Sequence, residues 1–272
     1  MLQHRLKIMG ILNITEDSFS DGGAYLEPSK ALAQARRILE EGADIIDIGA
    51  ESTRPGAREM DAGLEAERLI PIIQSIRKDH PEAVISVDTR KAMVAAEALR
   101  EGAAIINDVS ALRHDSAMPE LLSAHPNTPL VLMHMQGEPQ SMQNNPSYVD
   151  LGSELMDFFR ERIEFCQRHG ISRIILDPGI GFGKNLSHNL FIIANLQRFK
   201  ELGYPVLLGA SRKRFINEIY PCPTSERIGG SLAAVAAAMR AGLDYVRVHD
   251  VKASKQFIEV QTRILEEKLW AF

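Results

Sequence analysis

Polar side chains follow nearly every apolar run of the sequence, and one group of them can accept hydrogen bonds. Asp88, Asn107 and Asp177 come at the ends of three such runs. Carboxylate and amide groups of this kind can hold the N–H edge of a flat polar heterocycle, because each ligand N–H can donate to a carboxylate. The residues therefore suggest a heterocycle site. Pairing of single carboxylates with lysine or arginine inside the protein stays open as the alternative.

A second group is cationic and also follows the apolar runs: Arg54, Arg212, Lys213, Arg247 and His249. These side chains suit an anionic group, because arginine binds phosphate or carboxylate through two parallel hydrogen bonds. Each charged hydrogen bond contributes about 1.5–3 kcal/mol. Together the two groups predict a ligand that is polar and flat at one end and anionic at the other.

The segment DPGIGFGK at 177–184 has the look of a phosphate-binding loop but departs from its pattern. Pro178 stands where the first glycine of GxxxxGK[ST] belongs, and Asn185 follows Lys184. The sequence also has no HExxH or CxxC motif, so a structural zinc site is not expected.

Eight apolar runs must position these residues, and they are read as strands. They lie at 6–13, 43–49, 83–88, 103–108, 129–134, 173–178, 205–210 and 244–250. Helix-period stretches separate them at 28–41, 64–78, 92–101, 149–169, 190–202 and 225–241. The runs are continuously Val/Ile/Leu-rich, which is typical of parallel strands buried on both faces. Several helical stretches end in glycine before the next run, as at Gly42 and Gly102.

Eight strand–helix units in 272 residues match the size of a (β/α)₈ barrel, about 250 residues. We therefore expect an α/β protein with a single TIM-barrel domain over 1–272 and its site at the C-terminal strand ends. A doubly wound open sheet is the alternative. The glycine-rich loops after the first two strands, 15–25 and 50–63, are long enough to close on a substrate, or are disordered surface loops.

Composition excludes several classes of protein. With 31 basic against 36 acidic residues the net charge is −5, so a general nucleic-acid binder is not expected. Cys166 and Cys222 are too few for a disulfide framework and fit a reducing compartment. The start has no apolar segment typical of a signal peptide, and the run at 231–239 is far short of a membrane span of about 20 residues. We expect a cytoplasmic protein without nucleic-acid or membrane partners.

Eight segments at the strand ends carry a family resemblance. In chain order they are MGILNITEDSFSDGG, GAESTRPGA, SVDTRK, IINDVS, MHMQG, LDPGIGFGK, GASRKRF and RVHDVK. Together they resemble the dihydropteroate synthase family of pterin-binding enzymes, from about residue 7 to about residue 252. The resemblance implies a (β/α)₈ barrel that joins 7,8-dihydropterin-6-ylmethyl diphosphate to 4-aminobenzoate, which gives 7,8-dihydropteroate and pyrophosphate.

The resemblance also implies roles for individual residues. The pterin ring is expected to contact Asp88, Asn107, Asp177, Lys213, Met133 and Phe182. Pyrophosphate is expected at Asn13, Thr53, Arg54, Arg247 and His249, with Mg²⁺ held partly by Asn13. Aminobenzoate is expected beside Phe19, Thr53, Pro55, Ser211 and Arg212. The expected catalytic residues are Asp21, Arg54, Lys213, Arg247 and His249.

The chemistry favours a dissociative substitution. An aryl amine is neutral at pH 7, and a diphosphate departs well once metal, arginine and histidine neutralise its charge. We expect pyrophosphate to leave first and the amine to attack the resulting cation. Asp21, in the first long loop, is the candidate that stabilises this cation.

Some residues depart from the family pattern, and other functions remain open. Glu16 stands where proline is common, Arg90 and Ala92 where serine and proline are frequent, and Glu138 where threonine is frequent. A pterin barrel that transfers a methyl group from a folate to a corrinoid protein is one alternative. A non-catalytic pterin-binding paralogue is the other.

The oligomeric state has two interpretations. The small-residue segment at 229–242 can pack on a neighbouring subunit or on its own barrel. The family resemblance favours a homodimer.

Overall fold

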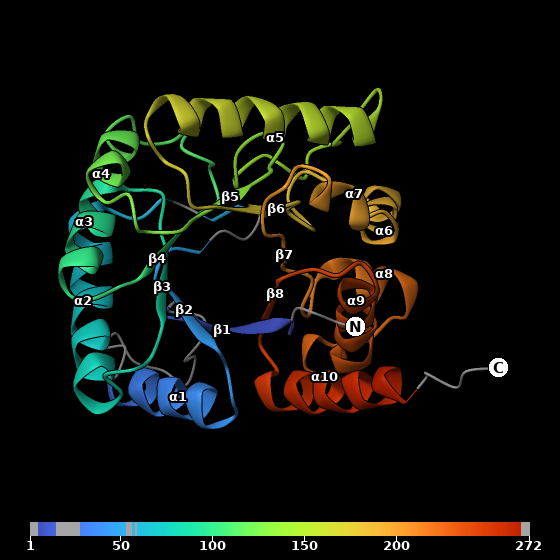
Figure 1. Ribbon diagram of the computed structural model, residues 1–272, viewed down its shortest axis with the longest axis horizontal. Helices are drawn as coiled ribbons and strands as arrows, with labels where there is room; N and C mark the ends of the chain where they lie inside the picture. Colours follow the sequence, from blue (N-terminus) through green and yellow to red (C-terminus); the bar gives the residue numbers. More distant parts are fainter. Residues whose placement is uncertain (1–4, 15–27, 53–55, 58, 268–272) are drawn as a thin grey trace.

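The structure, a computed structural model, describes residues 5–14, 28–52, 56–57 and 59–267. Strands surround the centre of the molecule in Figure 1, and helices form a layer outside them. The strands are β1 (Lys7–Asn13), β2 (Ile45–Gly49), β3 (Ile85–Asp88), β4 (Ile105–Asp108), β5 (Leu130–Met133), β6 (Ile174–Asp177), β7 (Leu207–Leu208) and β8 (Tyr245–Val248).

Parallel pairing runs around the barrel in the order β6-β5-β4-β3-β2-β1-β8-β7. A parallel bridge between Leu176 of β6 and Val206, just before β7, joins the two ends of this order. The (β/α)₈ barrel predicted from the spacing of apolar runs is confirmed, and the open doubly wound sheet is wrong.

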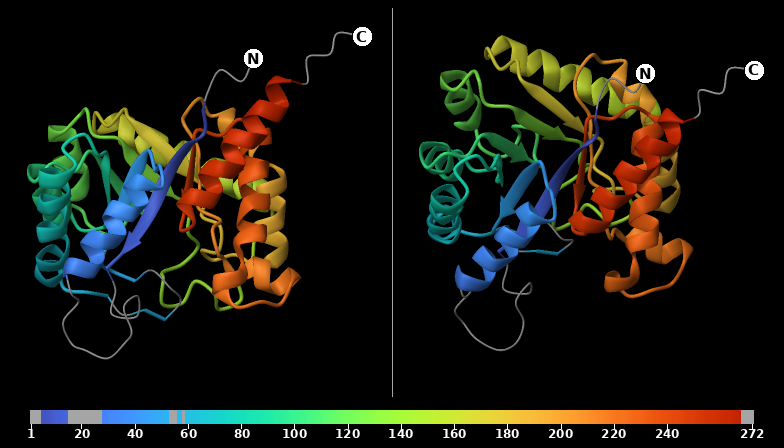
Figure 2. Two further views of the ribbon diagram at one scale, coloured as in Figure 1. Left: turned by 90° about the horizontal axis from the view of Figure 1, so that it is seen from below. Right: turned by 60° about the horizontal axis from the view of Figure 1, so that its bottom comes forward.

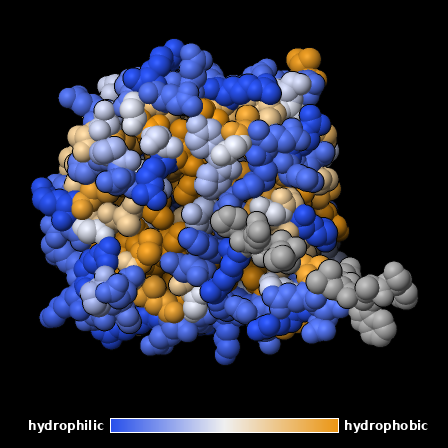
Figure 3. All heavy atoms as spheres, viewed as in Figure 1, coloured by the Kyte–Doolittle hydropathy of each residue, from blue (hydrophilic) through white to orange (hydrophobic). Residues whose placement is uncertain are grey.

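Helices connect the strands and cover them. They are α1 (Pro28–Glu40), α2 (Ala62–Asp79), α3 (Ala92–Arg100), α4 (Met118–Ala124), α5 (Leu151–Arg168), α6 (Leu186–Ala194), α7 (Gln197–Lys200), α8 (Arg214–Ile219), α9 (Ile228–Arg240) and α10 (Val251–Glu266). No helix within the described ranges is both long and apolar enough to cross a membrane. Hydrophilic residues cover much of this helical layer on the face drawn in Figure 3, with hydrophobic residues visible between them.

The predicted helix at 190–202 differs most from the structure, because a cap and a break fix its true limits. The Asn185 side chain accepts a hydrogen bond from the His188 N–H at 2.9 Å, so α6 begins at Leu186. It ends at Ala194, and the short α7 follows. The short helices α4 and α8 were not among the predicted stretches, and the strand predicted at 205–210 narrows to two residues.

Two apolar layers set the position of the site. The larger one lies between the strands and the outer helices and includes Ile46, Ile73 and Leu176. The smaller one comprises Met9, Ile45, Ile105, Val131, Ile175 and Leu207, which form a separate buried cluster. Side chains alternate between the two faces of a strand, so these residues fill the barrel interior as a floor. The next inward side chains lie one layer nearer the C-terminal strand ends, which point downward in the left view of Figure 2.

Candidate active site

The layer above this floor is polar on most strands. It holds Asp47 two positions after Ile45, Asn107 after Ile105, Met133 after Val131, Asp177 after Ile175 and Arg247 after Tyr245. The strand period of two therefore places acidic, amide and cationic side chains in one ring inside the barrel. This ring is the candidate active site.

Arg247 is the centre of the ring. Its Nε donates to Asp47 Oδ2 at 2.6 Å, and its Nη2 donates to Asp88 Oδ2 at 2.9 Å. Asn107 Nδ2 also donates to Asp47 Oδ2, at 3.2 Å. Asp47 is fully buried, and among the described residues its Oδ1 has no hydrogen-bond partner. The ring thus contains the internal ion pairing considered as an alternative.

Burial sets the protonation of the two carboxyl groups named from the sequence. It raises the pKa of Asp88 to about 7, against the lowering effect of Arg247. It also raises the pKa of Asp177, although Asp177 Oδ1 accepts the Gly179 N–H at 2.8 Å. Hydrogen bonds from a ligand favour the ionised form of a carboxyl. A ligand with several N–H donors would therefore stabilise the ionised form of both carboxyl groups.

An apolar wall stands beside the ring. Met133 and Phe182 belong to one buried cluster with Val109, Met135 and Met142. Lys213 Nζ lies 4.2 Å from the centre of the Phe182 ring, within the range of a cation–π contact. Burial, followed by the charge of Arg247, lowers the pKa of Lys213 to about 8. The wall and the ammonium together suit an aromatic ligand with electron-rich atoms.

His249 and Ser211 form a neutral polar pair after β8 and β7. His249 Nδ1 lies 3.1 Å from Ser211 Oγ, and the His249 backbone N–H donates to the same oxygen at 3.2 Å. Burial, followed by the charge of Arg247, lowers the pKa of His249 to about 3. Sequence interpretation counted His249 among the cations. In the structure it is neutral at pH 7 because an imidazolium next to Arg247 would be buried and repelled.

Arg212 is engaged with a neighbouring carboxylate. Its Nε and Nη2 donate to the two oxygens of Asp250, at 2.9 and 2.5 Å. Its backbone has φ 56°, and its N–H donates to Ser231 Oγ at 2.9 Å. The Arg212 guanidinium therefore lies against Asp250, whereas the ammonium of the next residue, Lys213, lies over Phe182.

Asn13 ends β1, half-buried, and pairs in register with Gly49 of β2. The remaining candidates, Phe19, Asp21, Thr53, Arg54 and Pro55, and also Glu16, lie outside the described residues. Within the described part of the chain, no three or more His, Cys, Asp or Glu residues gather as a metal site.

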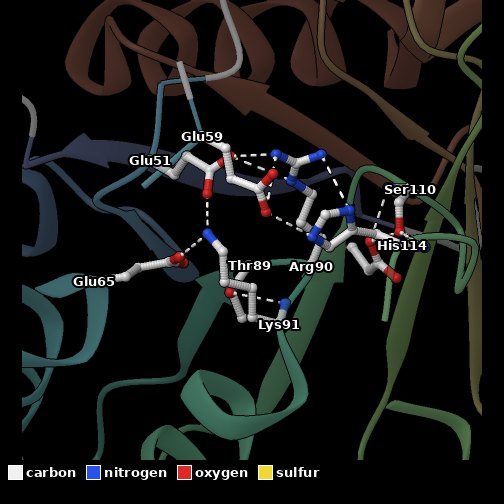
Figure 4. A network of polar contacts seen from close by, with 9 residues as sticks. Glu51, Glu59, Glu65, Thr89, Arg90, Lys91, Ser110 and His114 are labelled. Atoms are coloured by element: carbon white, nitrogen blue, oxygen red, sulfur yellow. Dashed lines mark hydrogen bonds and ion pairs between the residues drawn. The ribbon is translucent and has the colours of Figure 1, made fainter. Parts of the chain in front are cut away.

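A buried ion network braces the site from the β2 and β3 side (Figure 4). Lys91, three residues after Asp88, donates to both Glu51 and Glu65, with a distance of 2.5 Å to Glu65. Glu51 follows β2, and Glu65 lies in the first turn of α2. One lysine therefore ties both flanks of the segment between β2 and α2 to the end of β3.

Arg90 extends this network. Its Nη2 lies 2.6 Å from Glu51 Oε1, and its Nη1 lies 3.4 Å from His114 Nδ1. His114 Nε2 in turn lies 3.0 Å from Glu59. Arg90 was noted as a departure from the family pattern, and the structure shows it as a second cation on Glu51.

Sequence reasoning missed Asp47 and Lys91. Asp47 interrupts the apolar run IIDIG at an inward position, and this buried carboxylate was a readable signal. Lys91 gave no such signal, because its two glutamates are 40 and 26 residues away along the chain. Only the folded barrel brings them together.

Known proteins resemble this chain in both sequence and fold. The profile of the family described as pterin binding enzyme matches residues 9–249. The chain is 44% identical over 261 residues to a dihydropteroate synthase of Synechocystis sp., which spans 94% of this chain and 89% of that protein. It is 43% identical over 263 residues to one of Escherichia coli, spanning 96% and 92%.

Solved structures give the same picture. A Yersinia pestis dihydropteroate synthase with a sulfonamide drug complex has a TM-score of 0.91 at 40% identity and covers 96% of this chain and 95% of its own. A Xanthomonas albilineans dihydropteroate synthase in complex with 7,8-dihydropteroate has a TM-score of 0.86 at 38% identity, with 97% and 95% covered. One from the same organism with 4-aminobenzoic acid has a TM-score of 0.90 at 40% identity, with 97% and 94% covered.

Proposed function

The chain belongs to the family of pterin-binding enzymes, and on that premise we propose that it is a transferase with dihydropteroate synthase activity. It joins 7,8-dihydropterin-6-ylmethyl diphosphate to 4-aminobenzoate and releases pyrophosphate. The observation that carries the proposal is the position of Arg247, held between Asp47 and Asp88 at the centre of the polar ring. It places a cation for the diphosphate next to acceptors for the pterin edge.

The pterin edge is assigned to the acidic side of the ring. A pterin offers several N–H donors along one edge, which match the carboxylates of Asp88 and Asp177 and the amide of Asn107. These bonds return the charged form to carboxyl groups whose pKa burial has raised. Met133 and Phe182 supply the wall for the flat ring, and Lys213 lies over Phe182.

The diphosphate is assigned to Arg247, His249 and Asn13, together with Thr53 and Arg54. Arg247 is a fixed cation, because Asp47 and Asp88 raise its pKa although burial alone would lower it. His249 is neutral and acts by hydrogen bonding. The charge of Arg247 and hydrogen bonding by His249 would therefore both stabilise the leaving diphosphate.

Mg²⁺ fits this end of the site as an ion carried by the diphosphate. Mg²⁺ binds through one or two protein oxygens plus substrate phosphates and waters. Asn13 supplies one neutral oxygen at the end of β1. When bound, the ion would neutralise charge on the leaving diphosphate.

Aminobenzoate is assigned to Phe19, Thr53, Pro55, Ser211 and Arg212. Of these, Ser211 is buried beside His249, and Arg212 bonds Asp250. The Arg212 guanidinium would have to share or leave Asp250 to meet the carboxylate of this substrate.

The reaction is a dissociative substitution. The bond between the pterin methylene carbon and the diphosphate oxygen breaks, and its electron pair leaves with pyrophosphate. The lone pair of the aryl amine then forms the new C–N bond, and the amine loses a proton. Asp21 is assigned to the stabilisation of the intermediate cation.

A cytoplasmic location and a homodimer belong to the same proposal. Cys166 and Cys222 are unpaired, which fits the cytoplasm. A homodimer would have about twice the 30.2 kDa mass of the chain in solution.

The test is amine-dependent turnover. Purified protein is mixed with Mg²⁺ and dihydropterin diphosphate, with and without 4-aminobenzoate, and pyrophosphate is measured. Release that depends on the amine and stops with EDTA supports the proposal. Release without the amine at the same rate would contradict it.

A further inference from the structure

The loop after β6 has three successive carbonyls that each accept a side-chain hydrogen bond. Gln143 Nε2 donates to the Gly181 carbonyl at 2.5 Å, Lys184 Nζ to the Phe182 carbonyl at 3.0 Å, and Tyr148 Oη to the Gly183 carbonyl at 2.7 Å. Surface loops usually give such groups to water. Here the backbone on both sides of Phe182 is held by protein donors.

The same loop lies directly against the segment that follows β5. Gly179 has φ 68°, and a Cβ added there would lie 2.0 Å from the His134 carbonyl oxygen. Gly183 has φ 63°, and a Cβ there would lie 2.5 Å from the Gln136 carbonyl oxygen. Only glycine allows this approach, because a side chain would need both the strained φ and the occupied space. The two segments therefore form one packed unit.

Lys184 is buried at the centre of this unit. Besides the Phe182 carbonyl, its Nζ lies 2.9 Å from His134 Nδ1 and 3.2 Å from the His134 carbonyl oxygen. Three acceptors match the three donors of an ammonium group, and burial lowers the pKa of Lys184 to about 7, so the hydrogen bonds rather than a fixed charge hold the amine in place. Burial lowers the pKa of His134 to about 2, so the imidazole is neutral and its Nδ1 can accept. Lys184 is thus a polar pin between the loops after β5 and β6.

The pin acts on the wall of the proposed pterin site. The ring of Phe182 packs with Met133 and receives Lys213 on its face. A shift of the Phe182 backbone would move the ring, and with it the contact with Lys213. We propose that Lys184 and Tyr148 are positioning residues that hold Phe182 for the pterin, an inference that rests on the proposed function. Neither residue needs to touch the substrate for this role.

Lys184→Met removes the ammonium group and keeps an unbranched side chain that is one atom shorter. It is expected to weaken dihydropterin binding about tenfold, because the hydrogen bonds to two buried carbonyls are lost. Tyr148→Phe removes one neutral hydrogen bond and is expected to weaken dihydropterin binding about threefold. The Michaelis constant for 4-aminobenzoate should change less than the pterin affinity in both variants.

Lys200→Met is the matched control. Lys200 Nζ donates to Asp244 Oδ2 at 2.6 Å, and Asp244 directly precedes β8 at the opposite end of the barrel. Loss of this lysine contact is expected to change stability and leave pterin affinity unchanged. The melting temperatures of all variants are recorded alongside binding.

The experiment measures dihydropterin diphosphate affinity by titration calorimetry for the wild type, the three variants, Phe182→Leu and the Lys184→Met/Phe182→Leu double variant. If Lys184 acts through Phe182, the double variant should have about the same dihydropterin diphosphate affinity as whichever single variant has the lower affinity. Additive losses, or a Lys184→Met variant with lowered melting temperature and unchanged affinity, would overturn the inference. If Lys184→Met does not fold, the pterin affinities of Tyr148→Phe and Lys200→Met are compared instead. An affinity of Tyr148→Phe no lower than that of Lys200→Met would then overturn the inference. A wild-type protein that does not bind the pterin contradicts the proposed function itself.

Discussion

Arg247 reaches Asp47 across the barrel interior, with 2.6 Å between its Nε and Asp47 Oδ2, although the two residues are 200 positions apart in the chain. The carboxylate is fully buried, and Arg247 also bonds Asp88. A guanidinium fixed by two carboxylates is already oriented before a ligand arrives. In the proposed function it keeps its place between the pterin edge and the diphosphate.

Asp47→Asn is expected to weaken both stability and turnover. The substitution removes one partner of a buried ion pair, which typically costs about 3–5 kcal/mol. Arg247 would then be less firmly oriented, so kcat/KM for the pterin diphosphate should fall about tenfold or more. Chemical denaturation and steady-state kinetics measure the two effects.

The control for this variant is Asp44→Asn. Asp44 lies just before the same strand, at the opposite end of the barrel, and accepts the Ile8 N–H at 2.8 Å. Kinetics equally reduced in both variants would mean that Asp47 has no special relation to the site.

Pterin affinity is expected to depend on pH with a maximum between about 7 and 8. Burial raises the pKa of Asp88 to about 7, and its charged form accepts ligand N–H donors, so affinity should rise as the pH passes 7. Burial lowers the pKa of Lys213 to about 8 and that of Lys184 to about 7, so affinity should fall at higher pH as these two ammonium groups are lost. Calorimetric titration from pH 5.5 to 9.5 measures both limbs.

Asp88→Asn cannot ionise at this position, so it should lack the rise near pH 7 while it keeps the fall near pH 8. If the pterin affinity of this variant has the same pH dependence as that of the wild type, the rise near pH 7 belongs to another group.

Sequence patterns predicted the barrel fold and several residues of the polar ring, and there is a physical reason for this. Strand period and burial both act locally, so the apolar run before Asp177 already predicts an inward carboxylate at its end. Side-chain direction is not local. The Arg212 guanidinium meets Asp250, and His249 is neutral because of Arg247, and neither contact can be read from spacing.

The same distinction explains the helices. The cap at Asn185 is a short local signal that the broader apolar pattern of 190–202 obscured. Lys91 and Lys184 are harder to predict, because Glu65 and His134, which they bond, are 26 and 50 residues away along the chain.

Lys91→Met is expected to destabilise the fold strongly. It leaves the carboxylates of Glu51 and Glu65 buried near each other without their shared cation, and breaking a buried pair in this way costs about 3–5 kcal/mol. The double variant Lys91→Met/Glu65→Gln should recover part of the loss, because one uncompensated charge is gone. Urea denaturation measures the free energy of unfolding.

Lys255→Met serves as the surface comparison, since Lys255 pairs with the half-exposed Glu259 at 3.2 Å. Such a pair contributes at most about 1 kcal/mol. If Lys91→Met costs no more than this, the network in Figure 4 does not brace the β2 and β3 ends.

Asp21→Ala is expected to lower kcat by about 100-fold while pterin affinity changes little. Its assigned role is to stabilise a charge that exists only after pyrophosphate has left, and such contacts act on the rate rather than on binding. Turnover and calorimetric affinity are compared in the same preparation. A turnover number near that of the wild type would remove Asp21 from the mechanism.

The most direct test of the link between the polar ring and the proposed reaction is the formation of 7,8-dihydropteroate by the wild type and by Asp177→Asn, measured side by side. Asp177 ends β6 inside the ring, and asparagine keeps its size while removing the charge that is assigned to the pterin N–H edge. The account predicts product in step with pyrophosphate for the wild type. It predicts kcat/KM about 10- to 100-fold lower for a variant that melts at a similar temperature. Equal product formation by the two proteins, or no product from the wild type, would contradict it.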